Sequence, residues 1–301
     1  WKAMGAGTNN SIYTLGVHLN ELVVGGSFSA SALSFAFAQQ TVSTSRIARW
    51  DGTYWHPFGG GFANGSGSAN IRAAVTYNNE LIVGGEFSSA PGTAANNIAR
   101  WDGVRWHPLA NGVQFGALSD GGVYALGQFQ GDLYVGGIFS GAGSPTATKN
   151  IARWDGSAWH DMGTGANGVV YAFTIYKNSL YTGGAFSTMD GVTANRLARW
   201  SGSGWFDADS GNTEFLSAVQ ALAVFNNLLF AGGSFSTFGG VSSPNIAAWN
   251  GSTWSGTGGG LYGSSHAQVE ALAVFGGELV AAGKFYNSAF GGLGSIARWN
   301  G

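Results

Sequence analysis

A six-residue string recurs along this chain at intervals of about 50 residues and constrains its fold more than any other feature. Three copies read IARWDG and three are close variants, and they begin at Ile47, Ile98, Ile151, Leu197, Ile246 and Ile296. In the first five copies the tryptophan is followed five residues later by another, at Trp55, Trp106, Trp159, Trp205 and Trp254. Because a repeat of this length decides the fold before any local pattern does, the sequence predicts six similar structural units.

A second signature lies between the tryptophan pairs. It is an apolar segment that ends in two small residues, in most copies a glycine pair, and then an aromatic, at Phe28, Phe87, Phe139, Phe186, Phe235 and Phe285. Another apolar segment precedes each copy and is joined to it by a tight turn such as Asn78-Asn79. Each unit is therefore predicted to contain four strands, with Asp-Gly or Asn-Gly steps turning the third strand into the fourth.

These patterns predict an all-β fold, a six-bladed β-propeller of four-stranded blades in a single domain. Blades stack face to face, and the glycine pair would let neighbouring sheets approach closely. The predicted boundaries are about 11–59 for blade 1, 70–110 for blade 2, 122–163 for blade 3, 169–208 for blade 4, 218–257 for blade 5 and 268–301 for blade 6.

The two ends of the chain account for the remaining tryptophans. Trp299 has no second tryptophan after it, and Trp1 is the only other one of the 12 tryptophans outside the five pairs. Residues 1–5 (WKAMG) resemble the outer strand of blade 3, which begins at Trp159 (WHDMG). We therefore expect residues 1–5 to form the outer strand of blade 6 and to close the ring. We also expect these 301 residues to be part of a longer chain.

With these motifs, the chain resembles kelch-like propellers, in which a glycine pair closes the second strand and aromatic residues bracket the outer hairpin. It is more similar to the bacterial and fungal secreted repeat proteins with LYVGGxF and IARWDGxxW motifs, such as the ectodomain of the fungal Rax2-type cortical polarity marker. This resemblance covers the whole chain and implies an extracellular or cell-surface location. It implies no particular activity.

Connection lengths indicate which face of the blades carries function. The separation from the first-strand position to the aromatic that ends the second strand, as from Arg72 to Phe87, is identical in all six blades, and paired tryptophans are always five apart. The separation from the second tryptophan to the next first-strand position varies between blades, and the connection from Phe28 to Ile47 is longer than its counterparts. Because consecutive strands alternate in direction, the variable connections emerge on one side, the loop-rich face, and the invariant ones on the constant-turn face.

The first strand of each blade contributes one polar or amphipathic residue near the loop-rich face: Tyr13, Arg72, Tyr124, Tyr171, Gln220 and Glu270. Tyrosine rings for stacking and charged groups for orientation would make these residues a site for a sugar or a peptide. Internal ion pairing is the alternative. Glu86 follows Arg72 by fourteen residues, and Lys284 follows Glu270 at the same distance, so each charge has an opposite charge at its expected cross-strand neighbour.

Two sets of repeated polar residues are predicted to be structural. The motif arginines recur in the string itself and should each stack on an aromatic or reach a carbonyl: Arg49, Arg100, Arg153, Arg199 and Arg298. His56, His107 and His160 occupy one place on the outer strand of three blades. Strands ~4.8 Å apart place that strand about 14 Å from the innermost one, too far out for these histidines to share a zinc ion.

Two loops depart from the repeat. Asp207, Asp209 and Glu214 alternate oxygen ligands around a glycine, as a calcium loop does, although a solvated turn explains them as well. Leu33, Phe35 and Phe37 lie in the long blade-one loop and would contact a protein partner if exposed, or cap blade 1 if folded back. No cofactor other than this calcium ion is expected.

Composition narrows the function. With Lys+Arg 13 against Asp+Glu 15, the chain has no basic surface for nucleic acid, and no apolar run is long enough to insert in a membrane. Only 9 % of residues are charged and there is no cysteine, which leaves few groups for catalysis. The sequence favours a non-catalytic extracellular recognition or structural module that binds a protein, another domain of its chain, or a glycan. A lectin-like propeller is one alternative, and a polysaccharide hydrolase or lyase using His266 with Tyr13 or Glu270 is the other.

Overall fold

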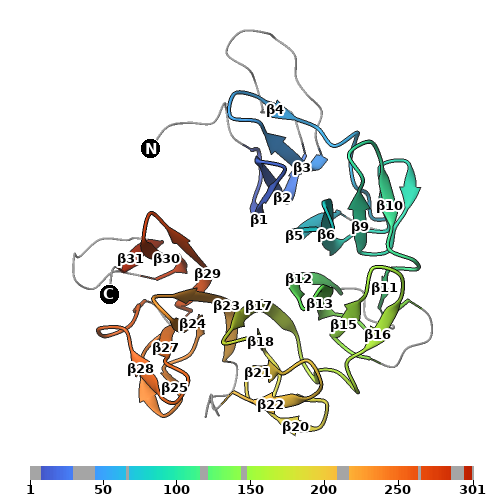
Figure 1. The fold of residues 1–301 in the computed structure, drawn as a ribbon. Helices are drawn as coiled ribbons and strands as arrows, with labels where there is room; N and C mark the ends of the chain where they lie inside the picture. Colours follow the sequence, from blue (N-terminus) through green and yellow to red (C-terminus); the bar gives the residue numbers. More distant parts are fainter. Residues whose placement is uncertain are drawn as a thin grey trace. The chain divides into compact units, whose positions relative to one another are not determined.

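The computed structural model describes residues 8–29, 45–65, 68–115, 121–143, 148–208, 217–263, 266–285 and 295–299. All regular structure in these ranges is β-strand, which confirms the all-β prediction. The chain forms two compact units, Trp1–Asp161 (unit 1) and Met162–Gly301 (unit 2), each containing three of the predicted blades. Figure 1 shows the strands of both units in sequence colours.

Unit 1 contains three four-stranded antiparallel sheets. Blade 1 consists of β1 (Ile12–His18), β2 (Glu21–Ser29), β3 (Ser45–Trp50) and β4 (Trp55–His56). Blade 2 consists of β5 (Asn70–Tyr77), β6 (Glu80–Glu86), β9 (Ile98–Trp101) and β10 (Trp106–Pro108). Blade 3 consists of β12 (Gly122–Phe129), β13 (Asp132–Ile138), β15 (Ile151–Trp154) and β16 (Trp159–Asp161).

Unit 2 repeats this order. Blade 4 consists of β17 (Val170–Tyr176), β18 (Ser179–Gly184), β21 (Leu197–Trp200) and β22 (Trp205–Asp207). Blade 5 consists of β23 (Ala218–Phe225), β24 (Leu228–Ser234), β27 (Ile246–Trp249) and β28 (Trp254–Gly256). Blade 6 has three strands among the described residues, β29 (Gln268–Phe275), β30 (Glu278–Lys284) and β31 (Ile296–Trp299). The outer strand predicted at residues 1–5 lies outside the described residues.

Short two-stranded ladders form in the connections between the blade strands. Three are hairpins between the second and third strands of a blade: β7 (Ser89–Ala90) with β8 (Thr93–Ala94), β19 (Thr188–Met189) with β20 (Val192–Thr193), and β25 (Thr237–Phe238) with β26 (Val241–Ser242). A fourth ladder joins β11 (Val113–Gln114) to β14 (Gly141–Ala142). These ladders order several loops of the loop-rich face.

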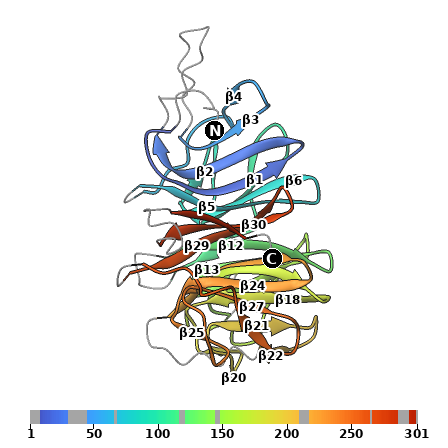
Figure 2. The same cartoon turned by 90° about the vertical axis from the view of Figure 1, so that its left-hand side faces the viewer.

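Within each unit, successive blades stack through their first strands. In unit 1, β1 contacts β5 and β5 contacts β12, and in unit 2, β17 contacts β23 and β23 contacts β29. Figure 2 shows β1 and β2 lying over β5 and β6. Strands covered on both sides should be apolar throughout, and β6 is accordingly buried at all five of its central positions.

The two glycines of each pair have different functions. A Cβ on Gly84 would lie 2.2 Å from Val123 Cγ1 of the next blade, so the first glycine permits close blade packing, as predicted. A Cβ on Gly85 would instead lie 2.0 Å from the backbone oxygen of Asn70 in its own blade. The second glycine therefore accommodates the backbone of the first strand, a function that the sequence analysis missed.

The tryptophan pairs bracket the outer hairpin of each complete blade, as predicted. The two rings lie 5.1 to 5.4 Å apart in all five cases. Trp106 also inserts beside the preceding blade, with its ring centroid 4.9 Å from Phe62 and 5.9 Å from Phe58. Its indole N–H donates to the Phe58 carbonyl oxygen at 2.8 Å. Trp106 therefore joins two blades as well as two strands.

Candidate functional site

A β-bulge positions each of the six first-strand residues predicted to bind a ligand. In blade 2, the pairing register of β5 with β6 shifts between Ile71 and Ala73, so Arg72 is the extra residue. The same shift makes the equivalent residue the bulged one in the other blades: Tyr13, Tyr124, Tyr171, Gln220 and Glu270. A bulge redirects the side chain of its extra residue. The same kind of β-bulge therefore sets the direction of all six side chains, the bulge residues.

In unit 1, three bulge residues come together around a guanidinium. The Arg72 guanidinium lies 4.4 Å from the ring centroid of Tyr13 and 5.4 Å from that of Tyr124. Its Nε donates to Glu86 Oε1 at 2.9 Å, which confirms the predicted ion pair. Asn70 Nδ2 donates to the other Glu86 oxygen at 2.5 Å. Arg72 is thus held by a carboxylate while its faces contact aromatic rings.

In unit 2, a hydrogen-bonded chain links two bulge residues. Gln220 Nε2 donates to Gln268 Oε1 at 3.2 Å, and Gln268 Nε2 donates to Glu270 Oε1 at 2.6 Å. Lys284 Nζ lies 3.2 Å from the same Glu270 oxygen, which confirms the second predicted ion pair. Among the described atoms, Gln220 Oε1 is buried without a hydrogen-bond partner. Tyr171 occupies the bulge of β17 and is half-buried.

The polar residue two positions before the charged bulge residue was not predicted from the sequence. Asn70 stands there before Arg72, and Gln268 before Glu270, and each donates to the carboxylate of the ion pair. A search for side-chain amides at that spacing would have found both. The charges at the Arg72 and Glu270 bulges are therefore paired with opposite charges within the protein.

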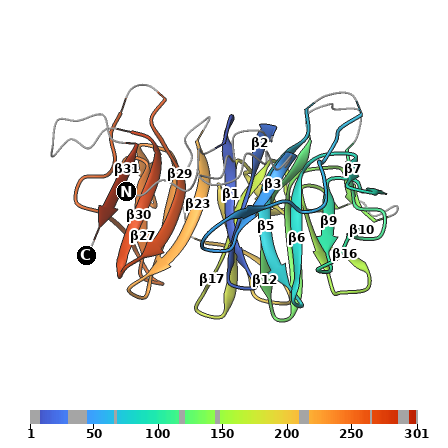
Figure 3. The ribbon, with the colours of Figure 1, turned by 90° about the horizontal axis from the view of Figure 1, so that it is seen from above.

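The connections on the two faces differ as their lengths predicted. The turn between the first and second strands has two residues with positive φ in every blade, such as Asn78 (48°) and Asn79 (62°). This is the type I′ geometry that favours asparagine and glycine. Figure 3 shows β5 and β6 side by side in unit 1, with the strands running between the two faces. The constant-turn face is thus uniform, whereas the loop-rich face differs from blade to blade.

The motif arginines are structural, as predicted, but Arg100, Arg153 and Arg298 pair with carboxylates instead of stacking on an aromatic ring or reaching a carbonyl oxygen. Arg100 pairs with Glu80, Arg153 with Asp132, and Arg298 with Glu278 at 3.3 Å. Arg49 pairs with Glu21 at 2.7 Å as well as lying 5.9 Å from the Phe58 ring. Arg199 stacks on Phe206 at 4.6 Å, as predicted.

The sequence contains a pattern that could have predicted these arginine–carboxylate pairs. The acid always lies seven residues before the aromatic that ends the second strand. Blade 4 has Ser179 at this position, and its arginine stacks on an aromatic instead. Blade 5 has Leu228 there and Ala248 in place of the arginine. Acid and arginine therefore occur together or are both absent in five of the six blades.

The three histidines of the outer strands each bond to an aspartate of their own blade. Nε2 of His56 lies 2.8 Å from Asp51, and those of His107 and His160 lie 2.6 Å from Asp102 and Asp155. No group of three or more His, Cys, Asp or Glu side chains able to hold a metal ion occurs in the described ranges. The histidines therefore stabilise the outer hairpins of their own blades.

The same aspartates organise the outer turns. Asp51 Oδ1 accepts the backbone N–H of Thr53 and of Tyr54, both at 2.7 Å. The Tyr54 N–H, then His56 and then the Thr53 N–H lower the pKa of Asp51 from 3.8 to about 2. Backbone and histidine hydrogen bonds also lower the pKa of Asp102 and of Asp155. These hydrogen bonds favour the ionised carboxylate in the folded state.

We predict an acid-dependent loss of stability from these turns. Their contribution is present above the unfolded-state pKa near 3.9 and is lost as the pH falls from about 4 towards 2. Substituting Asn at positions 51, 102 and 155 keeps the turn acceptor, as Asn250 does in blade 5. Melting temperatures of this triple variant should fall less between pH 6 and pH 2.5 than those of the unmodified chain. An Asp161→Asn control should retain the full fall, and equal falls in the triple variant and the unmodified chain would contradict the prediction.

Several predicted contacts lie outside the described residues. They are Leu33, Phe35 and Phe37 of the blade-one loop, and Asp209 and Glu214 of the calcium-like loop. Asp207 is described, exposed, and paired through its backbone with Ala198. His266 is described and exposed, and Glu270, its suggested catalytic partner, is engaged by Lys284 and Gln268.

The described part of the chain contains no helix of the length and apolarity needed to cross a membrane. No protein-family model and no curated protein matches the chain. Among solved structures, YjhT is 12% identical over 99% of this chain and 100% of its own, with a TM-score of 0.57. The WD40 propeller domain of Doa1 is 13% identical over 97% of this chain and 83% of its own, with a TM-score of 0.52. These likenesses concern the fold alone, and together with the six repeated blades they show that the chain is a six-bladed β-propeller.

Proposed function

We propose that this propeller is a non-catalytic recognition or structural module that binds a protein partner, or another domain of its own chain, through the loop-rich face. The observation that carries this proposal is the contrast between the two faces. Every first-to-second-strand turn has the same two-residue geometry, whereas the opposite connections differ in length and in added ladders. Variation confined to one face of a rigid scaffold is typical of a binding surface.

The bulge residues support recognition rather than acid–base chemistry. Arg72 and Glu270 are each paired with an opposite charge, and their side chains remain 33% and 47% exposed. A general acid or base needs a proton-transfer group free to reach substrate. Paired charges beside aromatic rings instead present fixed donors and an apolar surface, which suits a peptide or another protein surface. We also propose that the protein is extracellular or lies at the cell surface.

A glycan is the second candidate ligand, and one observation favours it. Gln220 Oε1 is a buried acceptor without a donor, and Tyr171 is the bulge residue of the preceding blade in the same unit. The tyrosine ring would supply a stacking surface for a sugar, whereas the buried Gln220 oxygen would have to become accessible before a sugar hydroxyl could donate to it. Calcium binding at Asp207, Asp209 and Glu214 remains a prediction.

The test compares two triple-arginine variants of equal charge in the same three blades. Ala94, Thr193 and Ser242 are exposed equivalents on the loop-rich face, and Val104, Ser203 and Ser252 are exposed equivalents in the constant outer turns. Peptides selected from a random phage-displayed library should bind the constant-turn variant as tightly as the unmodified propeller. They should bind the loop-rich variant about tenfold more weakly, a change of about 1.4 kcal/mol. The reverse ranking, or the selection of no peptide sensitive to the loop-rich variant, would contradict the proposal.

A glycan array on the same proteins separates the two ligand classes. Binding to particular sugars that is lost in Tyr171→Ala and in Gln220→Ala, with no selected peptide, would assign the propeller to the lectin-like class. Sugar binding unchanged in both variants would exclude the bulge residues as its site. Turnover of a polysaccharide on the array would overturn the non-catalytic proposal.

A further inference from the structure

A cleft of about 510 Å³ lies between blades 2 and 3 of unit 1. Blade 2 contributes Asn78, Glu80 and Arg100 to its lining, and blade 3 contributes Trp154 and Gly156. Asn78 belongs to a two-residue turn and Gly156 to an outer turn, so the cleft opens at the constant-turn face. Its volume falls within the range of about 300 to 1,000 Å³ that is usual for small-ligand sites. None of the bulge residues lines it.

The lining of this cleft is polar but carries no net charge, because its two charged side chains form an ion pair. Arg100 Nη1 contacts Glu80 Oε1, and the two side chains remain 35% and 31% exposed. The guanidinium has further N–H donors and the carboxylate has a second oxygen, and the Asn78 amide offers both a donor and an acceptor. A charged ligand would meet a like charge beside each opposite one, whereas a neutral polar ligand can bond to both.

An aromatic ring supplies the main apolar surface of the cleft. Trp154 is half-buried, and its ring centroid lies 5.2 Å from that of Trp159 in the same hairpin. Ile82 and Leu109 are buried beneath the opening. A sugar has an apolar C–H face that packs on an aromatic ring, and hydroxyl groups that both donate and accept hydrogen bonds. The lining of the cleft therefore matches a neutral sugar.

Side chains of the protein occupy the corresponding place between blades 1 and 2. Phe58 is the counterpart of Leu109 there. Its ring lies 5.6 Å from that of Trp101, the counterpart of Trp154, and 5.9 Å from the Arg49 guanidinium. Leu109 has no ring to fill this space, so the cleft remains open beside Trp154.

A lysine crosses the corresponding place between blades 4 and 5 of unit 2. Lys177 is the counterpart of Asn78, and its Nζ donates to the Asn250 carbonyl oxygen at 2.8 Å. A Cβ on Gly251, the counterpart of Gly156, would lie 2.2 Å from this nitrogen. The same Cβ on Gly156 would lie 3.8 Å from Asn78 Nδ2. The shorter asparagine therefore leaves the cleft between blades 2 and 3 open.

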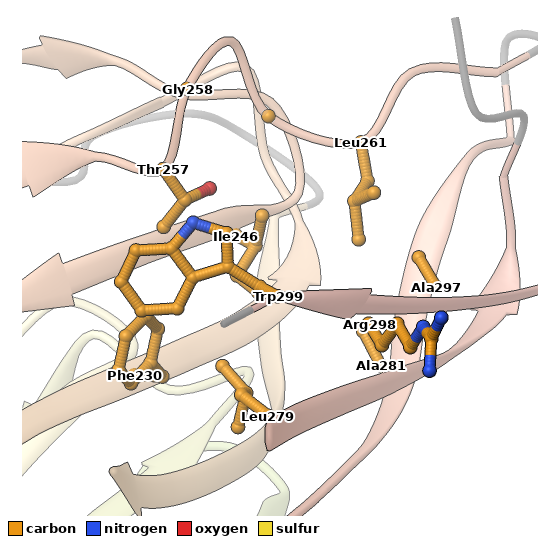
Figure 4. A pocket seen from close by; sticks show the side chains of 11 residues that line it. Phe230, Ile246, Thr257, Gly258, Leu261, Leu279, Ala281, Ala297, Arg298 and Trp299 are labelled. Atoms are coloured by element: carbon orange, nitrogen blue, oxygen red, sulfur yellow. The ribbon is translucent and has the colours of Figure 1, made fainter. Parts of the chain in front are cut away.

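The corresponding pocket between blades 5 and 6 is smaller, at about 180 Å³, and mainly apolar. Figure 4 shows Phe230 and Leu279 near Trp299, the counterpart of Trp154. Blade 5 has neither the acid nor the arginine of the ion pair, since Leu228 and Ala248 stand at those positions. The cleft between blades 2 and 3 thus joins an open volume to a polar lining with an aromatic ring.

We propose that this cleft binds one ring of a neutral sugar. The sugar packs against Trp154, and its hydroxyl groups bond to Glu80, Arg100 and Asn78. The site lies at the constant-turn face, so it is separate from the loop-rich face and from the bulge residues. The proposal does not rest on the function proposed above.

An array of neutral, acidic and amino sugars tests this proposal on the unmodified chain, Asn78→Lys and Asn226→Lys. Asn78→Lys copies Lys177 of blade 4, and it should weaken the binding of neutral sugars by about tenfold or more because the new side chain closes the cleft. Asn226→Lys is the matched control. It adds the same charge at the same turn position of blade 5, where φ is 47° against 48° at Asn78, and it should bind as the unmodified chain does.

Each result of the array decides the proposal. Binding of a neutral sugar by the unmodified chain and by Asn226→Lys, but not by Asn78→Lys, supports it. No binding of a neutral sugar, binding confined to acidic or amino sugars, or equal affinities in the two lysine variants would overturn it. Loss of neutral-sugar binding in Tyr171→Ala would also overturn it, because the sugar would then bind at a bulge residue.

Two further measurements keep the test unambiguous. Circular dichroism checks that both lysine variants fold. If Asn78→Lys does not fold, Leu109→Phe replaces it, since it copies Phe58 of blade 1 and should give the same loss, and unchanged binding in Leu109→Phe would contradict the proposal. Peptides selected against the loop-rich face should bind Asn78→Lys as tightly as the unmodified chain, so this proposal and the proposed function fail separately.

Discussion

Gly85→Ala is expected to destabilise the propeller by about 3 kcal/mol or more, at the upper end of what overpacking costs. The added Cβ would lie 2.0 Å from the Asn70 carbonyl oxygen and 3.0 Å from Ile71 Cα, both backbone atoms that cannot rotate away. Relief requires β5 and β6 to separate at the bulge that holds Arg72. Chemical denaturation followed by tryptophan fluorescence measures the loss.

The matched control is Gly204→Ala. Its added Cβ would meet only Phe206 Cε2 at 3.9 Å, so its stability should change by no more than about 0.5 kcal/mol. Ala282 stands in blade 6 where the other blades have the first glycine of the pair, so that position tolerates a methyl group in at least one blade. Equal stability of Gly85→Ala and Gly204→Ala would show that the second glycine is not required by the bulge.

Trp106→Ala is expected to destabilise the chain by about 3 to 5 kcal/mol, the range for removing a buried aromatic side chain. The ring is 3% exposed, contacts aromatic residues of two blades and donates to the Phe58 carbonyl. Its removal leaves a cavity between blades and a buried carbonyl without its donor. Urea unfolding monitored by far-ultraviolet circular dichroism gives the loss.

Two further variants resolve the origin of that loss. Trp106→Phe keeps most of the ring contact but not the indole N–H, so it should lie between Trp106→Ala and the unmodified chain. Val104→Ala, two residues away and 82% exposed, should change stability by no more than about 0.5 kcal/mol. An alanine variant at position 106 as stable as the Val104 control would contradict the role assigned to the outer tryptophan.

Most of the fold could be predicted from the sequence because the same motifs recur in six repeats, so each prediction was supported six times. The IARWDG strings predicted the third strands, the paired tryptophans predicted the outer hairpins, and the Asn78-Asn79 step predicted a two-residue turn. Each of these motifs reflects contacts between residues that are close in the sequence. Such contacts give the motif residues a regular spacing. The close approach of blades at the first glycine joins residues that are distant in sequence, and it was predictable because the glycine pair recurs at one place in most of the repeats.

The candidate site was predicted only in part. The constant separation from the closing aromatic of each second strand located Arg72 and its equivalents, but the bulge that presents them has no composition of its own. In the sequence, the only trace of the bulge is the second glycine of each pair. Blade packing would explain that glycine equally well. The carboxylate partners of the motif arginines were missed because the paired residues lie on different strands and are distant in sequence, although the acid keeps a fixed place before the aromatic.

In blades 2 to 6, a β-bulge turns one side chain out of the packed stack directly after a buried residue. Single cysteines test this claim, since the chain has none of its own. Substitution at Arg72, Tyr124, Tyr171, Gln220 or Glu270 should give thiols that react with a maleimide about tenfold or more faster than at the preceding residue. Those preceding residues are fully buried: Ile71, Val123, Val170, Val219 and Val269. Fast labelling at the bulge positions and protection one residue earlier in all five blades is the result expected, and equal labelling rates at the two positions would contradict the account.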